Sequence, residues 1–432
     1  MTNASISRRS LIASSAAAAG LAALGRAPAL AQAEVRLRMF WWGAKDRQER
    51  TEKANRLFEQ KNSGMTVAGE TLGWGDYWPR LATQVAGRNV ADVIQMDYRY
   101  IFEYARRGAL LPLDEFVPKE LNLSDFDAAA VDSGKVDGKI YGVSLGLNST
   151  AFLYDKQLIQ SLGLKEPSWD TTWAQFADLA TEVTKAAKKD GFFGSVDGAR
   201  EEPALDVFLR QHGKALYTAD GKLGFDEKDI AEWFGFWDDL RKRGGAAAPD
   251  VQALDMGQEI NTSLLTQGRA AMVFANSNQL VGFQAANKSK LAMTMYPSGG
   301  AGAKPGQYLK PSQMLSVYAK TKEPKATIKL VDFYMNDKEG GAILGVERGV
   351  PASSAVRKSI EPTLGELDQA QTHYISFITD KVGALPPPPP GGAGEVQQLL
   401  RRVNEQVGFG KLTVADGAKQ FVTEAKSILA RG

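Results

Sequence analysis

The chain of 432 residues has no cysteine and only two histidines, His212 and His373. Without cysteine there is no disulfide, no thiol catalysis, no cysteine-ligated zinc and no lipid attached to a thiol. The two histidines are not spaced as a metal-binding pair. We therefore expect neither a metal site nor a cofactor.

An excess of one charge and long apolar runs are also missing. Lys and Arg total 52 against 50 Asp and Glu, and three of the arginines lie in residues 1–33, so the rest of the chain has 49 basic residues against 50 acidic ones. This near-neutral balance gives no support for binding nucleic acid or an anionic membrane surface. No run after residue 33 is long and apolar enough to span a bilayer, so we expect no membrane anchor.

The first 33 residues have the pattern of an export signal. Arg8 and Arg9 precede an Ala-rich run over 11–24, and Ala31-Gln32-Ala33 has small residues at the spacing that a signal peptidase recognises. We expect residues 1–33 to direct export to the periplasm by the twin-arginine route. The remaining roughly 400 residues are too many for one compact core and predict two domains.

Alternating strand and helix patterns in the first half predict an α/β fold. Apolar residues alternate or run together in three predicted strands, over 35–40, 65–72 and 90–96. Helical patterns separate these strands, an order typical of a mainly parallel sheet flanked by helices.

The second half has the same character. Thr172 is placed to cap a helix, and another helix ends at Gly244. Further strands are predicted over 270–275, 291–296 and 313–318. The Gly-rich run 298–306 has the freedom expected of a hinge, and the proline run Pro386 to Pro390 predicts a stiff connector.

One motif permits a catalytic interpretation. The sequence Gly142-Val143-Ser144-Leu145-Gly146 matches the nucleophile elbow of serine hydrolases. The elbow requires a strand, a sharp turn and then a helix, whereas residues 140–153 have an extended pattern with no helix signal. A secreted hydrolase would also need Ser144 beside His212 or His373. We keep it as an alternative and expect that the protein is not an enzyme.

Tryptophans cluster where predicted strands end. Trp41, Trp42, Trp74 and Trp78 lie just past these ends, where ligands bind in open parallel sheets. Sugar rings stack on aromatic side chains, and their hydroxyl groups need polar partners. The same loops supply such partners in Lys45, Asp46, Arg47, Asp76, Asp97 and Arg99. The alternative is that some of these tryptophans are core residues, as we expect for Trp173, Trp233 and Trp237, which have helical spacing.

A second polar cluster follows the strand predicted over 270–275. Asn276, Ser277 and Asn278 either cap a turn or face a polar ligand, because an unpaired buried amide is costly.

Taken in order, several short motifs resemble the sugar-binding extracellular solute-binding proteins of ABC importers, the family that includes maltose-binding protein. The resemblance covers nearly the whole chain after residue 33. Its pieces are Phe40-Trp41-Trp42-Gly43, Ala91-Asp92-Val93-Ile94-Gln95, Lys139-Ile140-Tyr141-Gly142-Val143, residues 148–156, Gln267-Gly268-Arg269-Ala270-Ala271-Met272 and Arg348-Gly349-Val350-Pro351. Gly73-Trp74-Gly75-Asp76-Tyr77 is further similar to members that bind plant-derived oligosaccharides, including oligogalacturonides.

The resemblance implies two α/β lobes joined by three crossovers, the periplasmic-binding-protein fold, with a ligand held in the cleft between them. The first lobe would comprise residues 34–145 plus 311–347, and the second 146–310 plus 348–432. The motif at Ser144 would then fall in the first hinge, which explains its glycines without catalysis.

The same resemblance implies a set of ligand-binding residues. They are Trp41, Trp42, Asp46, Trp74, Gln95, Asp97, Asn148, Asn276, Ser277, Asn278, Ser312, Gln313 and Arg348. Maltose-binding protein has an aromatic residue near the positions of Asn276 to Asn278, so we expect a ligand that is more heavily hydrogen-bonded than a long glucan. Arg47, Arg99 and Arg348 leave open an acidic sugar, since guanidinium pairs well with carboxylate.

The implied function is capture of a sugar, an oligosaccharide or a sugar derivative for delivery to the permease subunits of an importer. A sugar that bridges both lobes shifts the population from an open to a closed form. We expect a monomer. Besides the hydrolase, a third alternative is an extracellular interaction protein without a small ligand, which would use its aromatics as a partner surface.

Overall fold

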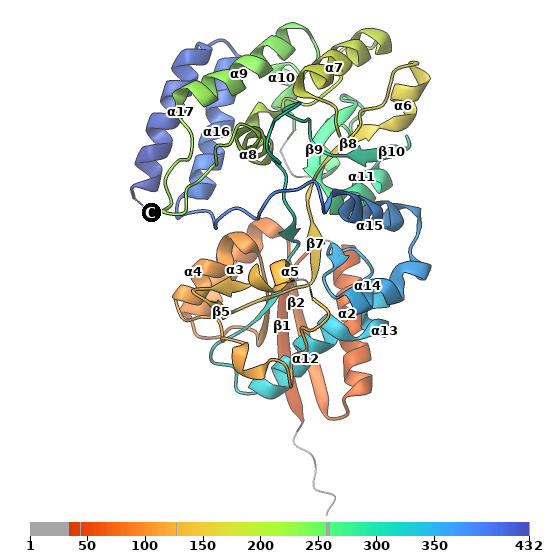
Figure 1. The fold of residues 1–432 in the computed structure, drawn as a ribbon. Helices are drawn as coiled ribbons and strands as arrows, with labels where there is room; N and C mark the ends of the chain where they lie inside the picture. Colours follow the sequence, from red (N-terminus) through yellow and green to blue (C-terminus); the bar gives the residue numbers. More distant parts are fainter. Residues whose placement is uncertain (1–33, 44, 127, 256–259, 432) are drawn as a thin grey trace, which may run out of the picture.

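The computed structural model describes residues 34–43, 45–126, 128–255 and 260–431. The export signal predicted over 1–33 lies outside these residues. The chain forms two lobes, one above the other in Figure 1, and the segments that join them run through the middle of the molecule. Within the described ranges, no helix has the length and apolar character needed to cross a membrane.

The first lobe is built on a five-stranded sheet in the order β2-β1-β3-β12-β6. Its strands are β1 (Val35–Trp42), β2 (Met65–Leu72), β3 (Val93–Met96), β6 (Val143–Ser144) and β12 (Met314–Val317). β1 runs parallel to β2 and β3, whereas β12 is antiparallel to both β3 and β6. The three strands predicted from apolar runs therefore exist, but the sheet is mixed because β12 returns from the second lobe in the opposite direction.

Helices cover both faces of this sheet, because both faces of β1 are apolar. Leu37, Met39 and Trp41 pack on one side and Phe40 and Trp42 on the other. The first side lies under α2 (Lys45–Lys61) and α12 (Pro324–Asn336), and the second under α3 (Trp74–Ala86) and α4 (Tyr98–Arg106). The other elements of this lobe are α5 (Ala128–Asp132), β4 (Lys135–Val136), β5 (Lys139–Ile140), α13 (Lys338–Leu344) and α14 (Ser354–Ile360).

The second lobe corrects the expectation of a mainly parallel sheet. Its three strands, in the order β10-β8-β9, are antiparallel. They are β8 (Thr150–Asp155), β9 (Met272–Asn276) and β10 (Leu291–Thr294). Among the described residues of this lobe, parallel pairing is limited to isolated bridges, as between Phe193 and Ala270.

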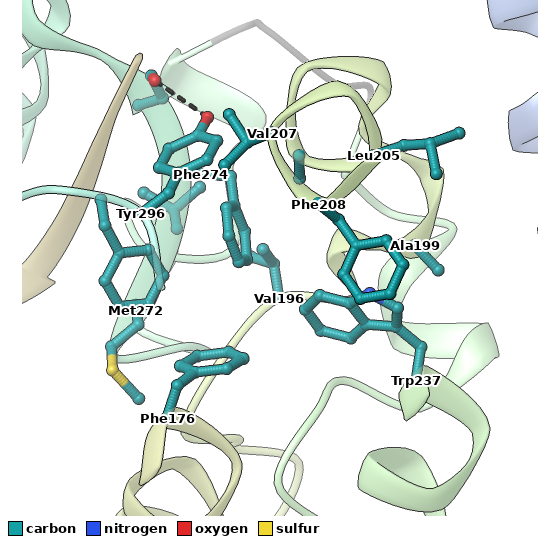
Figure 2. Packing of buried hydrophobic residues seen from close by; sticks show 14 of the residues in the cluster. Phe176, Val196, Ala199, Leu205, Val207, Phe208, Trp237, Met272, Phe274 and Tyr296 are labelled. Atoms are coloured by element: carbon teal, nitrogen blue, oxygen red, sulfur yellow. Dashed lines mark hydrogen bonds between the residues drawn. The ribbon is translucent and has the colours of Figure 1, made fainter. Parts of the chain in front are cut away.

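Large aromatic residues fill the core of the second lobe (Figure 2). Thr172 caps α7 with Gln175 in a capping box, as its position predicted. Trp173, Trp233 and Trp237 are buried, which confirms that they are core residues. A Cβ on Gly198 would lie 2.6 Å from the Trp237 ring, so this position requires glycine. The helices are α6 (Lys156–Ser161), α7 (Trp173–Ala187), α8 (Glu202–Gln211), α9 (Glu227–Lys242), α10 (Pro249–Gln252), α11 (Leu280–Ala286), α15 (Glu366–Ile378), α16 (Ala393–Gly408) and α17 (Val414–Leu429).

The three crossings between the lobes form a small antiparallel sheet in the order β11-β7-β13. Its strands are β7 (Gly146–Asn148), β11 (Lys310–Pro311) and β13 (Val350–Pro351). A Cβ on Gly146 would lie 2.7 Å from the Arg348 carbonyl oxygen, so the second glycine of the elbow-like motif is required by strand packing.

One detail of the expected hinge and one of the expected lobe bounds are corrected. Residues 298–306, expected to act as a hinge, are tied within the second lobe, because Ser298 and Lys304 are hydrogen-bonded to Thr171 and Gln211. Helix α14, expected in the second lobe, packs against α13 and α12 of the first lobe, and Val356 fills the space beside Gly341. The chain therefore stays with the first lobe for about one helix beyond β13.

Candidate functional site

Four rings form an aromatic wall at the carboxyl ends of β1 and β2: Trp42, Trp74, Trp78 and Tyr100. Trp42 and Trp74 meet edge to face with their centroids 5.1 Å apart, and Trp78 stacks on Tyr100 at 3.8 Å. Helix α3 begins at Trp74, which leaves that indole 43% exposed while Trp42 is buried behind it. An exposed ring fixed by other rings offers a rigid apolar face for stacking.

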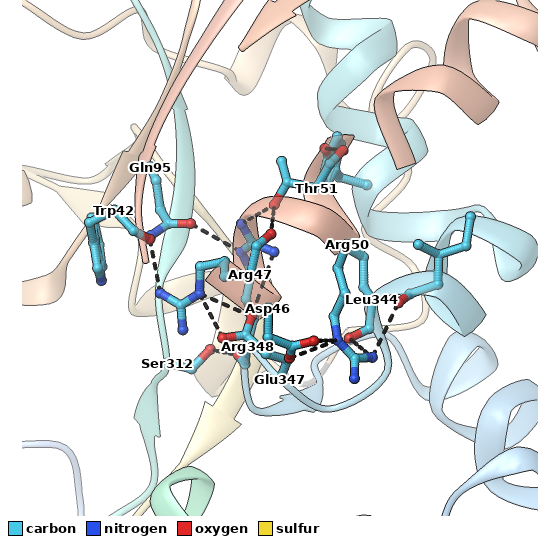
Figure 3. A network of polar contacts seen from close by, with 12 residues as sticks. Trp42, Asp46, Arg47, Arg50, Thr51, Gln95, Ser312, Leu344, Glu347 and Arg348 are labelled. Atoms are coloured by element: carbon cyan, nitrogen blue, oxygen red, sulfur yellow. Dashed lines mark hydrogen bonds and ion pairs between the residues drawn. The ribbon is translucent and has the colours of Figure 1, made fainter. Parts of the chain in front are cut away.

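A buried group of polar side chains lies beside this wall, and we call it the hinge network: Arg47, Thr51, Gln95, Glu347 and Arg348 (Figure 3). Arg348 donates from Nε to Gln95 Oε1 at 3.0 Å and from Nη2 to Thr51 Oγ1 at 2.7 Å. Arg47 Nε donates to both carboxylate oxygens of Glu347, at 2.8 and 3.0 Å. Burial lowers the pKa of Arg348 to about 10. The network ties α2 and β3 to the chain just before β13.

The hinge network corrects two predicted ligand residues. Gln95 has no exposed surface, and its amide nitrogen donates to the Trp42 carbonyl at 3.1 Å while its oxygen accepts from Arg348. Arg348 is 3% exposed. These two side chains bind each other, so they hold the hinge and are not free to hydrogen-bond a ligand.

Four other predicted ligand residues are placed elsewhere by the structure. Trp41 lies in the core, because neighbouring residues of a strand point to opposite faces and only Trp42 faces the wall. The Trp41 ring leaves no room for a Cβ on Gly69. Asp46 lies in the first turn of α2 and pairs with Arg50 at 3.0 Å. Ser312 donates to the Arg348 carbonyl, and Gln313 is buried at 3% exposure.

The remaining predicted residues lie at or near the junction of the lobes. Asp97 caps α4 by accepting the Arg99 N–H at 2.8 Å. Asn148 lies on β7 opposite Lys310 of β11. Ser277 Oγ accepts from the Ser149 N–H at 3.3 Å. Asn276 ends β9 and has a buried amide oxygen without a hydrogen-bond partner in the described chain, whereas Asn278 is partly exposed.

Between the lobes lies a cavity of about 120 Å³, which we call the inter-lobe cavity. By water-sized volume it has room for about ten water molecules or one sugar unit. Its charged lining comes from both lobes and from the hinge, in Arg99, Glu202, Asp206 and Lys310. The rest of its lining includes Tyr217, Tyr308 and three residues of the proline run, Pro386, Pro387 and Pro389.

Side chains of α4 cross from the first lobe to the second at this cavity. Arg99 Nη2 pairs with Glu202 at 3.2 Å, and its Nη1 lies 3.5 Å from Gln397 Oε1. The Tyr98 hydroxyl donates to the Pro386 carbonyl at 3.2 Å. The two lobes therefore touch each other beside the cavity.

Two groups of the cavity have shifted titration. Burial raises the pKa of Asp206 to about 7, although the nearby charge of Arg210 opposes the shift. Burial lowers the pKa of Lys310, although the charges of Asp97 and Glu202 oppose it. The carboxyl group of Asp206 is therefore about half protonated near neutral pH, and burial destabilises the charged form of Lys310.

Sequence reasoning missed Glu202, Asp206 and Lys310. A signal for Lys310 was present, because it is the only charged residue in the otherwise uncharged run 307–319. Glu202 and Asp206 lie one helical turn apart at the start of α8, a spacing that puts both on one face. No local pattern indicated that this face meets α4 of the other lobe.

The geometry does not assemble the serine hydrolase alternative. Ser144 is buried and donates to the Gly146 carbonyl at 2.7 Å. His212 contacts the Phe208 carbonyl at 2.7 Å through Nδ1 and caps the carboxyl end of α8 in the other lobe. Over the described residues, no group of His, Asp and Glu is placed to hold a metal ion.

Two lobes, three crossings and a cavity lined by residues of both lobes define a ligand-binding clamp. The chain belongs to the bacterial extracellular solute-binding protein family, whose sequence profile matches residues 54–363.

Similar proteins support this family assignment. An extracellular solute-binding protein of family 1 from Alicyclobacillus acidocaldarius is 32% identical, with a TM-score of 0.73 over 92% of this chain and 99% of that chain. A putative binding protein of Brucella abortus is 25% identical over 324 residues, which are 73% of this chain and 75% of that protein. The fold is also that of a periplasmic oligogalacturonide binding protein from Yersinia enterocolitica in complex with saturated digalacturonic acid, 24% identical, with a TM-score of 0.82 and coverage of 92% and 99%.

Proposed function

We propose that the chain is the substrate-binding component of a carbohydrate ABC importer and captures a sugar or sugar derivative between its lobes. The observation that carries the proposal is the inter-lobe cavity, which is closed by residues of both lobes and lined by polar side chains. Helix α4 links the aromatic wall to the cavity, because it has Tyr100 of the wall and Arg99 of the cavity lining. A sugar needs both an apolar face to stack on and polar partners for its hydroxyl groups.

The family supports an exported binding role, and the name of the Yersinia protein supports a carbohydrate ligand. We place the protein in the periplasm as a monomer that hands its ligand to membrane permease subunits. We assign it no enzymatic activity and no affinity for nucleic acid. The ligand residues of this proposal are Trp42, Trp74, Asp97, Asn148, Asn276, Ser277 and Asn278, to which the cavity adds Lys310.

The lobes in this proposal follow the three crossings. The first comprises residues 34–145 and 311 to about 363, and the second comprises 146–310 and about 364 to 432. The mechanism is a population shift toward the closed form, since only closure encloses the ligand with contacts from both lobes.

A thermal-shift screen tests the proposal. The exported chain is purified through an unfolding and refolding step that removes carried-over ligand, and it is heated with neutral sugars, oligosaccharides, alditols and uronates. A ligand at one hundred times its Kd stabilises the folded state by about 2.7 kcal/mol, which raises the Tm by a few degrees. A flat response to every carbohydrate would overturn the proposal and favour an interaction protein. The hydrolase alternative predicts turnover that Ser144→Ala abolishes, and it is removed if the wild type shows no turnover of any ligand that it binds.

A further inference from the structure

Every arginine near the cleft that is able to bind an acidic ligand already has a protein partner. Arg47 makes a double hydrogen bond to Glu347, and Arg348 is held by Gln95 and Thr51. Arg99 pairs with Glu202 across the lobes. None of the three is therefore left over for a ligand carboxylate.

Lys310 differs from these arginines. It lies on β11, lines the inter-lobe cavity and is only partly exposed. Its ammonium group makes no hydrogen bond and no ion pair with any described residue, although three nitrogen-bound protons are available to donate. A desolvated ammonium without a partner is costly, so its position calls for a compensating group.

The carboxylates around Lys310 are engaged elsewhere. Asp97 accepts the Arg99 N–H as the cap of α4, and Glu202 is paired with Arg99. Asp206 is 6% exposed, and burial raises its pKa to about 7, so about half of it is neutral at that pH. The charges of Asp97 and Glu202 act on Lys310 from a distance, but among the described residues neither forms an ion pair with its ammonium group, whose hydrogen-bond donors are therefore left for a ligand.

We infer that Lys310 is the anchor for an acidic group of the ligand, and that the ligand is an acidic sugar such as a uronate. This inference rests on the proposed function and narrows its substrate class. The volume of the cavity fits one sugar unit, so the carboxylate belongs to the unit that enters the cavity. Further units would extend toward the exposed face of Trp74.

The experiment compares a sugar acid with its uncharged methyl ester and with the parent hexose, which has no acid group. Isothermal titration measures binding of D-galacturonate, its neutral methyl ester and D-galactose to the full exported chain. The same triplets are made for D-glucuronate and D-mannuronate, and for short oligouronides. In the wild type we expect the acid of at least one triplet to bind about 30-fold more tightly than its ester, the factor that corresponds to one charged hydrogen bond.

Two variants assign this preference to a residue. Lys310→Met keeps the unbranched side chain to within one atom of its length and removes its charge, and we expect it to abolish the preference for the acid. Lys304→Met, at an exposed lysine on the 298–306 loop, is the matched control and should leave the preference unchanged. Lys310→Met without ligand should also melt higher than the wild type by about 2 °C, because a methionine does not bear the desolvation cost. A lysine with a structural role would give the opposite sign.

The results distinguish failure of the inference about Lys310 from failure of the proposed function. If esters or neutral hexoses bind as tightly as the acids, the inference about Lys310 is wrong while the proposed carbohydrate function stands. An acid preference that survives in Lys310→Met also overturns the inference. If no sugar of either kind binds, both fail together.

Discussion

The hinge network and the inter-lobe cavity are both groups of charged and polar side chains near the crossings, but their charges are arranged differently. In the hinge network Arg47 is bonded to Glu347, and Arg348 to Gln95 and Thr51. In the inter-lobe cavity Lys310 has no hydrogen bond or ion pair with a described residue, and Asp206 has a pKa raised to about 7. The first arrangement pairs its charged groups within the protein, whereas the second leaves the donors of an ammonium group unused. Buried charged groups therefore do not by themselves indicate a binding site, because their partners decide whether they are free to bind a ligand.

The largest expected effect comes from breaking the hinge network at its centre. Arg348→Ala removes the donors to Gln95 and Thr51, which leaves the Gln95 side-chain oxygen buried without a partner and the Thr51 hydroxyl with only its bond to the Arg47 carbonyl. We expect the free energy of unfolding to fall by about 3 kcal/mol, measured by urea denaturation. Arg56→Ala, at an exposed position on α2, is the control and should change it by less than about 0.5 kcal/mol. A loss as small as that of the control would mean that the network is not structural.

A substitution at Gln95 tests the hinge network at a second residue. Gln95→Leu loses the hydrogen bonds to Arg348 and to the Trp42 carbonyl and should cost about 2 kcal/mol of stability. Combined with Arg348→Ala in a double-mutant cycle, it should show a coupling energy of about 1 kcal/mol. Additive losses would show that the two side chains act independently.

The third prediction concerns a residue that contributes to ligand binding but little to the stability of the fold. Trp74→Ala removes the exposed ring of the aromatic wall, so we expect sugar affinity to fall about 10-fold while the free energy of unfolding changes by less than about 1 kcal/mol. Trp169 is similarly exposed, at 49%, and lies outside the wall and the cavity. Trp169→Ala should leave affinity unchanged, and equal losses in the two variants would remove the wall from the site.

The smallest expected effect is a pH dependence from Asp206. Its pKa in the folded protein, about 7, lies above the ordinary value of 3.8. The stability that comes from the protonated form is therefore fully present below about pH 4 and is lost as the pH rises through about 7. Asp206→Asn imitates the protonated form. The Tm of this variant relative to the wild type should rise by about 2 °C between pH 5 and pH 8, measured by calorimetry. A constant difference would show that Asp206 is ionised at both pH values.

Much of the fold was predictable because its signals are local. The apolar runs of β1 and β2, the cap at Thr172 and the helical spacing of Trp233 and Trp237 are each contained in a short segment. The direction of β12 was not predictable, because it depends on where the chain re-enters the first lobe after residue 310. Its antiparallel pairing follows from tertiary topology alone.

The site was harder to predict because one strand turns neighbours to opposite faces. Trp41 and Trp42 are adjacent and alike, yet one lies in the core and the other in the aromatic wall. Gln95 and Arg348 are 253 residues apart, and no pattern in either segment reveals that they bind each other. A residue's partners decide whether its polarity is used inside the protein, and those partners come from distant segments.

The proline run at the edge of the inter-lobe cavity bears on the entropy of closure. Each pyrrolidine ring fixes φ near −65°, so the five residues from Pro386 to Pro390 lose little backbone freedom when a ligand and the opposite lobe hold them in place. Flexible residues in this position would lose about 1 to 2 kcal/mol each on being fixed, and the apparent affinity would fall accordingly. Prolines also lack an N–H, so the backbone of the proline run offers hydrogen-bond acceptors and no donors. One of its carbonyl oxygens already accepts from Tyr98. A molecule that touches it must bring its own hydrogen-bond donors, as a hydroxyl-rich molecule does.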